Sequence, residues 1–232
     1  METDYSVFEE KSGVKFGDKG ILTLAFTHRS YVNENREIAT GHNERLEFLG
    51  DAVLELVITD FLYKKYPDKT EGDLTSYRSA LVNANTLSEV ASTLGMNDYL
   101  LLSKGEAKDT GRARQYILAN TFESVVGAMF LDGGYDIAKK FIETHVSPLI
   151  DGIVENNSWI DAKSKFQEKA QEMENITPNY QTIKEIGPDH DKQFEVGVYL
   201  EDKLIETGLG KSKQEAEQEA AKKALAKTGW TE

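Results

Sequence analysis

The chain has 232 residues, a length that suggests one large domain or two modest ones. It contains no cysteine, which excludes disulfides and thiolate metal sites. No apolar stretch is long enough to span a bilayer. We therefore expect a cytoplasmic protein with no membrane partner. The net charge of −13 argues against a nucleic-acid-binding protein, unless the basic residues cluster and the acidic ones lie elsewhere or bind a metal.

The first two thirds of the chain show helical periodicity. Apolar residues repeat at spacings of three and four from Leu46 to Leu62, and Pro67 ends that helix. No alternating strand precedes residue 175, so we expect an all-α domain over residues 1–152. Its further helices are predicted over 71–81, 84–94, 116–132 and 135–146.

The first of these helices carries three acids on one face. Glu44, Glu47 and Asp51 stand at i, i+3 and i+7, so their side chains project in the same direction. Like charges on adjacent turns destabilise a helix, and a divalent cation would reverse that effect. Hard cations such as Mg²⁺ prefer oxygen ligands and need only one or two protein carboxylates plus substrate phosphates.

The helix over 116–132 offers a second polar pair. Asn120 and Glu123 stand at i and i+3, between apolar neighbours. Two helices that each present oxygen atoms from an apolar surface are expected to meet at one metal, as in helical bundles with carboxylate sites.

The pattern changes after residue 152. A polar stretch predicts a flexible linker over 153–160. Residues 161–230 then show the order α-β-β-β-α, in which Ser212 and Glu215 predict a capping box for the last helix. Its helices are expected over 163–173 and 212–227, and its strands over 180–186, 194–200 and 204–208.

The run from His42 to Leu54, HNERLEFLGDAVL, resembles the signature of the ribonuclease III family, metal-dependent endonucleases that cut double-stranded RNA. The second half resembles the double-stranded-RNA-binding domain. The resemblance covers nearly the whole chain and implies two domains, an all-α endonuclease domain followed by an α+β RNA-binding domain, as in the bacterial type. The matching segments of the second half are Ala162–Glu168, Pro178–Tyr180, Gly187–His190 and Gly210–Lys213, followed by Ala216-Glu217 and Ala220-Ala221.

This resemblance implies roles for particular acids. Glu47, Asp51 and Glu123 match the family's catalytic metal ligands, and Asn120 stands where the family usually has aspartate. An amide carbonyl can still ligate a hard cation, although without charge. Three further positions match secondary roles: Glu44 and Glu71 near the cleavage site, and Phe48 at the dimer interface. Glu71 could equally serve only the start of its helix.

The second domain offers groups suited to duplex RNA, whose wide minor groove shows hydroxyls and whose bases are hidden. Lysines at a helix N-terminus favour phosphate, because the backbone N–H groups there already attract anions. The expected minor-groove residues are Gln167, Glu168 and His190, the expected phosphate-binding residues are Lys211, Ser212 and Lys213, and Arg112 and Arg114 are expected as additional phosphate contacts.

The resemblance thus predicts a homodimeric endoribonuclease that uses Mg²⁺, with Mn²⁺ as a substitute, and acts on double-stranded RNA. It implies products with 5′-phosphate, 3′-hydroxyl and short 3′ overhangs, and roles in ribosomal and other RNA processing. The alternative is a double-stranded-RNA-binding protein whose nuclease half is weakened at Asn120. A helical metal hydrolase of nucleotides is a more distant possibility. The absence of His-Asp pairs argues against it, and so does the RNA-binding half.

Overall fold

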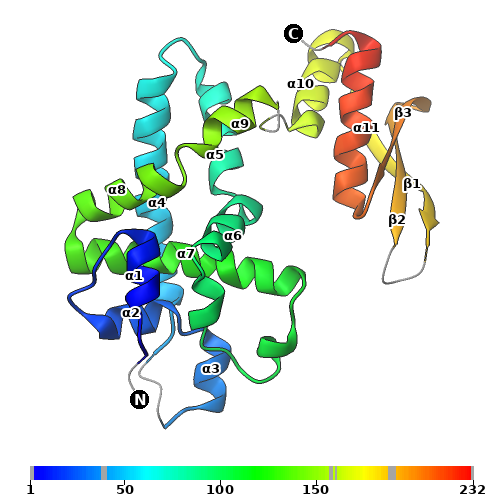
Figure 1. Ribbon diagram of the computed structural model, residues 1–232. Coiled ribbons are helices and arrows are strands. Elements are labelled where there is room, and N and C mark those ends of the chain that lie inside the picture. Colours follow the sequence, from blue (N-terminus) through cyan, green and yellow to red (C-terminus); the bar gives the residue numbers. More distant parts are fainter. Residues whose placement is uncertain (1–2, 38–40, 157–158, 160, 188–191, 231–232) are drawn as a thin grey trace. The chain divides into compact units, whose positions relative to one another are not determined.

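The computed structural model describes residues 3–37, 41–156, 159, 161–187 and 192–230 (Figure 1). The chain divides into two compact units, Met1–Trp159 and Ile160–Glu232, and each is described by itself. Within the described residues, no helix has both the length and the apolar character needed to cross a membrane.

The first unit is built from helices. Two of them have 22 residues, and most of the others are between six and 12 residues long. They pack around one apolar core. In chain order the elements are α1 (Ser6–Ser12), α2 (Lys19–Ala25), α3 (Arg29–Glu34), α4 (Glu44–Lys65), α5 (Glu71–Val82), α6 (Ala84–Thr93), the 3-10 turns η1 (Met96–Tyr99) and η2 (Glu106–Lys108), α7 (Arg112–Gly133), α8 (Tyr135–His145) and α9 (Leu149–Glu155).

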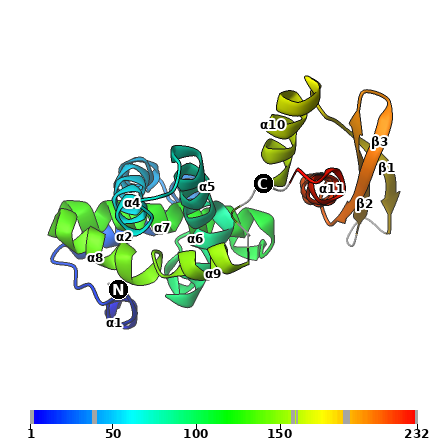
Figure 2. The same ribbon diagram turned by 90° about the horizontal axis from the view of Figure 1, so that it is seen from above.

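The two long helices, α4 and α7, form the centre of this unit. Figure 1 shows α4 crossing α7 steeply, and Figure 2 looks almost along the axis of α4. The middle of α7 is buried over most of its circumference, since nearly every residue from Ile117 to Met129 is shielded from solvent. A helix that is apolar on all sides is expected in the interior of a domain.

The segment that leads into α4 is fixed by backbone hydrogen bonds. Thr27 and Leu101 form an isolated parallel bridge. The backbone N–H of Asn43 donates to Thr27 O (2.9 Å), and its buried amide donates to Ala25 O (3.2 Å). The start of α4, which carries the first acids, is therefore held against the end of α2.

The structure differs from the sequence-based prediction at the start of α7 and in the expected linker, where it has the unpredicted helix α9. Helix α7 begins at Arg112, four residues before the predicted start. Helix α9 extends to Glu155, and the ring of Trp159 meets Tyr77 edge-on with centroids 4.8 Å apart. Part of the expected linker thus belongs to the first unit, and the flexibility of residues 153–160 stays a prediction.

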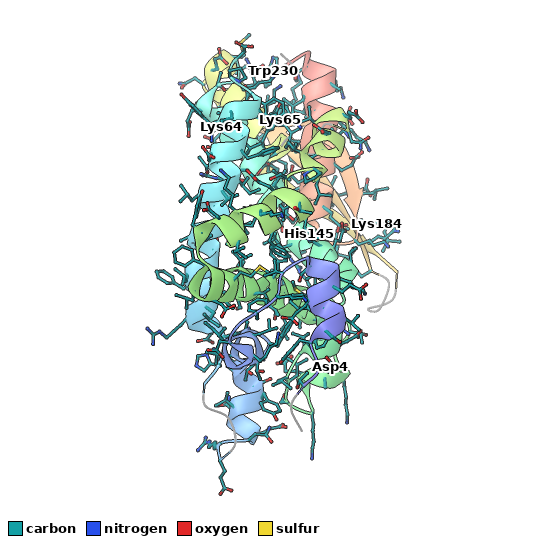
Figure 3. The ribbon with its side chains drawn as sticks, turned by 60° about the vertical axis from the view of Figure 1, so that its left-hand side comes forward. Asp4, Lys64, Lys65, His145, Lys184 and Trp230 are labelled. Carbon is teal, nitrogen blue, oxygen red and sulfur yellow. The ribbon has the colours of Figure 1, made fainter. Side chains whose placement is uncertain are left out.

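The second unit is a three-stranded antiparallel sheet in the order β1-β2-β3, packed against two helices. Its core includes Phe166 on the first helix, whose ring stacks on Trp230 at a centroid distance of 5.4 Å (Trp230 is labelled in Figure 3). The predicted fold class is confirmed. The elements are α10 (Ala162–Glu174), β1 (Asn179–Ile186), β2 (Gln193–Leu200), β3 (Lys203–Gly210) and α11 (Lys213–Thr228).

Two glycines bring α11 directly onto β3. A Cβ at Gly208 would lie 2.2 Å from Ala216 O, and one at Gly210 would lie 2.5 Å from Ala216 N. Any side chain at these positions would push the helix away. The N-terminus of α11 is consequently held beside the end of β3, which fixes where Lys211, Ser212 and Lys213 lie.

Candidate active site and RNA-binding surface

The crossing of α4 and α7 brings three carboxylates together. Burial raises the pKa of Glu123 to about 8, and the charges of Asp51 and Glu47 contribute to that increase. Burial also raises the pKa of Glu47, with the charges of Glu44 and Asp51 adding to it. Because the charge of Asp51 acts on both Glu47 and Glu123, and that of Glu47 on Glu123, the three carboxylates are electrostatically linked. We call Glu47, Asp51 and Glu123 the carboxylate group.

Asn120 joins this group on the side of Glu47. Its side chain forms a hydrogen bond with the Glu47 carboxylate, an interaction that opposes the rise in the pKa of Glu47. A carboxylate can only accept, so the Asn120 amide N–H donates. An aspartate at this position could not donate when ionised and would add a fourth negative charge.

The carboxylate group has the chemistry of a hard-cation site. All its donors are oxygens, and negative charge on the partly buried Glu47 and Glu123, beside the exposed Asp51, is costly without a positive partner. Among the described residues, no three His, Asp or Glu side chains are already arranged to enclose a metal ion. Mg²⁺ does not need such a cage, since it takes one or two carboxylates and fills its remaining positions with water and phosphate oxygens. The donors therefore fit this cation.

Glu44 lies next to this group but is paired with Arg29. Its carboxylate contacts Arg29 Nη1 at 3.3 Å and His42 Nδ1 at 3.7 Å. Neither Arg29 nor His42 has a periodic or metal-binding spacing to Glu44, so these contacts could not be predicted from the sequence. The side chain of His28 caps α3 by accepting from Ser30 N (3.3 Å).

Glu71 lies at the first position of α5. It accepts a hydrogen bond from Thr75 Oγ1 (3.1 Å), and the capping box of this helix is made by Thr70 and Asp73. In the part of the chain that the structure describes, no hydrogen bond or ion pair connects Glu71 to the carboxylate group. This arrangement favours a role at the helix start.

Phe48 projects from α4 between Glu47 and Leu49 with 81% of its surface exposed. Leu56 (57%) and Tyr63 (72%) are exposed on the same helix, at i+8 and i+15 from Phe48. These spacings place all three side chains within a quarter-turn of one another, so α4 presents an apolar stripe to solvent.

The two arginines at the start of α7 differ in their contacts. Arg114 donates to Asn97 Oδ1 (2.9 Å) and to Glu106 O (2.8 Å), which fits a role in holding the preceding loop. Arg112 is exposed and lies 5.7 Å from the centroid of the Tyr116 ring. Arg112 also donates from Nη2 to Tyr116 Oη (3.2 Å), but it is the more exposed of the two arginines and therefore the better placed for phosphate.

The RNA-binding residues expected in the second unit lie on two helices. Gln167 and Glu168 are exposed on α10, and Lys211 and Lys213 are exposed at the start of α11. His190 lies outside the described residues.

The start of α11 is capped in a different way from the prediction. Ser212 Oγ accepts from Glu215 N (3.2 Å) as expected. The Glu215 carboxylate, however, accepts from the backbone N–H of Lys211 (2.8 Å) and not from that of Ser212, so the predicted capping box is wrong in its second half. Lys213 pairs with Glu185 (3.4 Å) and lies 5.6 Å from the centroid of the Phe194 ring, which holds its ammonium group beside β1 and β2.

Comparison with known proteins identifies both units. A family model described as "Ribonuclease-III-like" matches residues 18–149, and one described as "Double-stranded RNA binding motif" matches residues 162–228. Ribonuclease 3 of Streptococcus pneumoniae is 45% identical over 227 residues, covering 98% of this chain and 97% of that protein. Ribonuclease 3 of Bdellovibrio bacteriovorus is 43% identical over 218 residues, covering 94% and 93%.

Solved structures agree with this assignment. The nuclease domain of ribonuclease III from Campylobacter jejuni is 35% identical, covers 65% of this chain and 95% of its own, and has a TM-score of 0.56. A second structure of that domain, described for structural flexibility in a region involved in dimer formation, is 36% identical with a TM-score of 0.55 and covers 61% of this chain and 98% of its own. The chain belongs to the ribonuclease III family of endoribonucleases.

Proposed function

We propose that this protein is a Mg²⁺-dependent endoribonuclease that cleaves double-stranded RNA as a homodimer. The observation that carries the proposal is the carboxylate group, in which the half-buried Glu123 has a pKa raised to about 8 beside two further acids. Such a group is unfavourable by itself and becomes favourable with a divalent cation. Mn²⁺ is expected to substitute, because it accepts the same oxygen ligands.

The residues of the chain would divide the work of cleavage. Glu47, Asp51 and Glu123, with the carbonyl of Asn120, would hold the cation, which when bound supplies the positive charge that offsets charge developing on the phosphoryl group. For Asn120 to act in this way, its amide must leave Glu47 and turn its carbonyl inward. Glu44 stays near this group, with its charge balanced by Arg29.

The homodimer would bring two such sites to one duplex. The apolar stripe of Phe48, Leu56 and Tyr63 supports it, because an exposed apolar surface of this kind is typical of an interface. A two-fold dimer fits a duplex that has its own approximate two-fold symmetry. One cut in each strand would leave 5′-phosphate and 3′-hydroxyl ends with short 3′ overhangs.

The second unit would supply affinity for the duplex. Gln167 and Glu168 would contact minor-groove hydroxyls, as would His190, and Lys211, Ser212 and Lys213 would contact phosphates at the N-terminus of α11. Family membership supports ribosomal and messenger RNA precursors in the cytoplasm as the substrates.

The test is cleavage of a long labelled RNA duplex with Mg²⁺, with Mn²⁺ and with EDTA. The Glu123→Gln variant should bind the duplex and fail to cut it. Glu143→Gln, on the outer side of α8, is the control and should cut as the unchanged chain does. Tight binding by the unchanged chain with no cutting in either metal would contradict the proposal and favour the binding-only alternative. Restored cutting in Asn120→Asp would then identify the cause.

A further inference from the structure

Two glycines lie where α4 crosses α7, one on each helix. A Cβ added at Gly50 would lie 1.7 Å from Glu123 O and 2.8 Å from Gly127 N. A Cβ added at Gly127 would lie 2.2 Å from Leu46 O and 3.1 Å from Gly50 N. All these neighbours are backbone atoms, which cannot rotate away as the end of a side chain can. The backbones of the two helices are therefore in direct contact.

The backbones in contact belong to the carboxylate group or adjoin it. The oxygen nearest to Gly50 is the carbonyl of Glu123, and the one nearest to Gly127 is the carbonyl of Leu46, which precedes Glu47. Gly50 itself precedes Asp51. The separation of the two helices at this point thus sets how far Glu123 stands from Glu47 and Asp51. Glycine within a helix is unfavourable relative to alanine, so two of them at one crossing indicate a requirement for close approach.

A buried hydroxyl braces the same crossing. Ser124, fully buried on α7, has its Oγ 2.8 Å from Asn120 O and 3.4 Å from Asn43 O. Asn43 is the residue before α4 and is itself buried. The hydroxyl has one proton and both neighbours are carbonyl oxygens, so it donates mainly to Asn120 O of its own helix, and its contact with Asn43 O is the weaker one. Through that second contact Ser124 packs α7 against the start of α4, next to the two residues of α7 that the site uses.

We propose that Gly127 and Ser124 are positioning residues for the cleavage reaction. They hold α7 against α4 so that Glu123 reaches the cation that Glu47 and Asp51 bind. This inference rests on the proposed function of the site. An alanine at position 127 must open the crossing by roughly 1 Å, a displacement that can cost about a hundredfold in rate when it moves catalytic groups.

The test measures the response to metal separately from stability. Gly127→Ala and Ser124→Ala are compared with the unchanged chain by three measurements: the Mg²⁺ concentration for half-maximal cutting of a labelled duplex, Mn²⁺ binding without RNA by paramagnetic resonance, and the thermal midpoint. Ser124→Ala adds no atom and removes one hydroxyl, so it serves if Gly127→Ala fails to fold. Both variants should need about 10- to 100-fold more Mg²⁺ and bind Mn²⁺ more weakly, the range typical of groups that support metal ligands.

Two controls separate positioning from general destabilisation. In Gly152→Ala, on α9, the new Cβ has no atom within 4 Å, so neither metal response nor stability should fall. In Ile150→Ala, a fully buried side chain of the same helix is truncated, so the thermal midpoint should fall while the metal requirement stays unchanged.

The proposal is overturned if the two variants lose stability with an unchanged metal requirement, or if Ile150→Ala raises that requirement as much as they do. An unchanged chain that binds Mn²⁺ but cuts no duplex would contradict the proposed function alone, because weaker Mn²⁺ binding by the two variants would still support the positioning role. An unchanged chain that binds no Mn²⁺ would overturn both.

Discussion

Replacing Glu123 by glutamine should stabilise the metal-free protein at high pH and not at low pH. The pKa of this carboxyl rises from 4.5 to about 8 because of burial and the neighbouring Asp51 and Glu47. Between these two pH values the folded protein keeps a proton that the unfolded chain has lost, so the free energy of unfolding falls as pH rises. Glutamine carries no such proton and avoids this loss.

The size of the effect follows from the same pKa values. The difference between 4.5 and about 8 corresponds to about 5 kcal/mol, at about 1.4 kcal/mol per pH unit. Because Glu123 keeps some contact with solvent, screening reduces this figure, and we expect about 2–3 kcal/mol of added stability at pH 8.5. At pH 4 both states of the unchanged chain are largely protonated, and the advantage of glutamine should vanish.

Urea unfolding in EDTA at pH 4, 6.5 and 8.5 measures this difference. The chain has two tryptophans, so a Trp230→Phe background leaves Trp159, which contacts Tyr77 in the nuclease unit, as the only indole fluorophore. Glu10→Gln, at an exposed position of α1, is the control and should show no gain that grows with pH. Equal stability differences at all three pH values would refute the reasoning about burial.

Three further predictions concern the metal, the dimer and the RNA. Asn120→Asp should lower the Mg²⁺ concentration for half-maximal cutting by about tenfold, because it adds a charged ligand. It should also destabilise the metal-free protein, because Glu47 loses its amide donor. Metal titration and unfolding in EDTA measure these two effects, and an unchanged titration would count against Asn120 as a ligand. Phe48→Ala should shift sedimentation from dimer to monomer, since each buried phenylalanine contributes about 1.5–3 kcal/mol, while an unchanged dimer would exclude the apolar stripe as the interface. Lys213→Ala should reduce the slope of log duplex affinity against log salt concentration by about 1. The control Lys227→Ala breaks an ion pair with Glu206 at the far end of α11 and should leave that slope unchanged. Equal slopes for the two variants would contradict the phosphate role of Lys213.

Several elements could be predicted from sequence because local signals mark them clearly. Helix α4 has a long apolar repeat and ends before Pro67, and the strands predicted over 180–186, 194–200 and 204–208 fall within β1, β2 and β3. The start of α7 lacked such a signal, since its first turn is Arg112, Ala113, Arg114 and Gln115, none of which enters the core. Predicting that helix start would have required knowing that Arg114 holds the loop before it.

The sequence predicted which side chains would form the candidate site, and their role stays a prediction, but it could not predict the contacts among them. Helical spacing placed Glu44, Glu47 and Asp51 on one face, but it could not show that Glu44 pairs with Arg29 while Glu47 is held by Asn120. These contacts depend on tertiary packing, which brings together residues far apart in the chain. Likewise, the spacing of the two glycines along their own helices gave no sign that they meet.

The contact between Trp159 and Tyr77 determines where the nuclease can be separated from the RNA-binding module. A fragment that ends at residue 152 would lack the indole ring and uncover Tyr77 on α5. It would also cut α9 short of Glu155. A fragment that ends at 159 keeps both, so an exchange of RNA-binding modules between relatives should join the foreign module after this tryptophan.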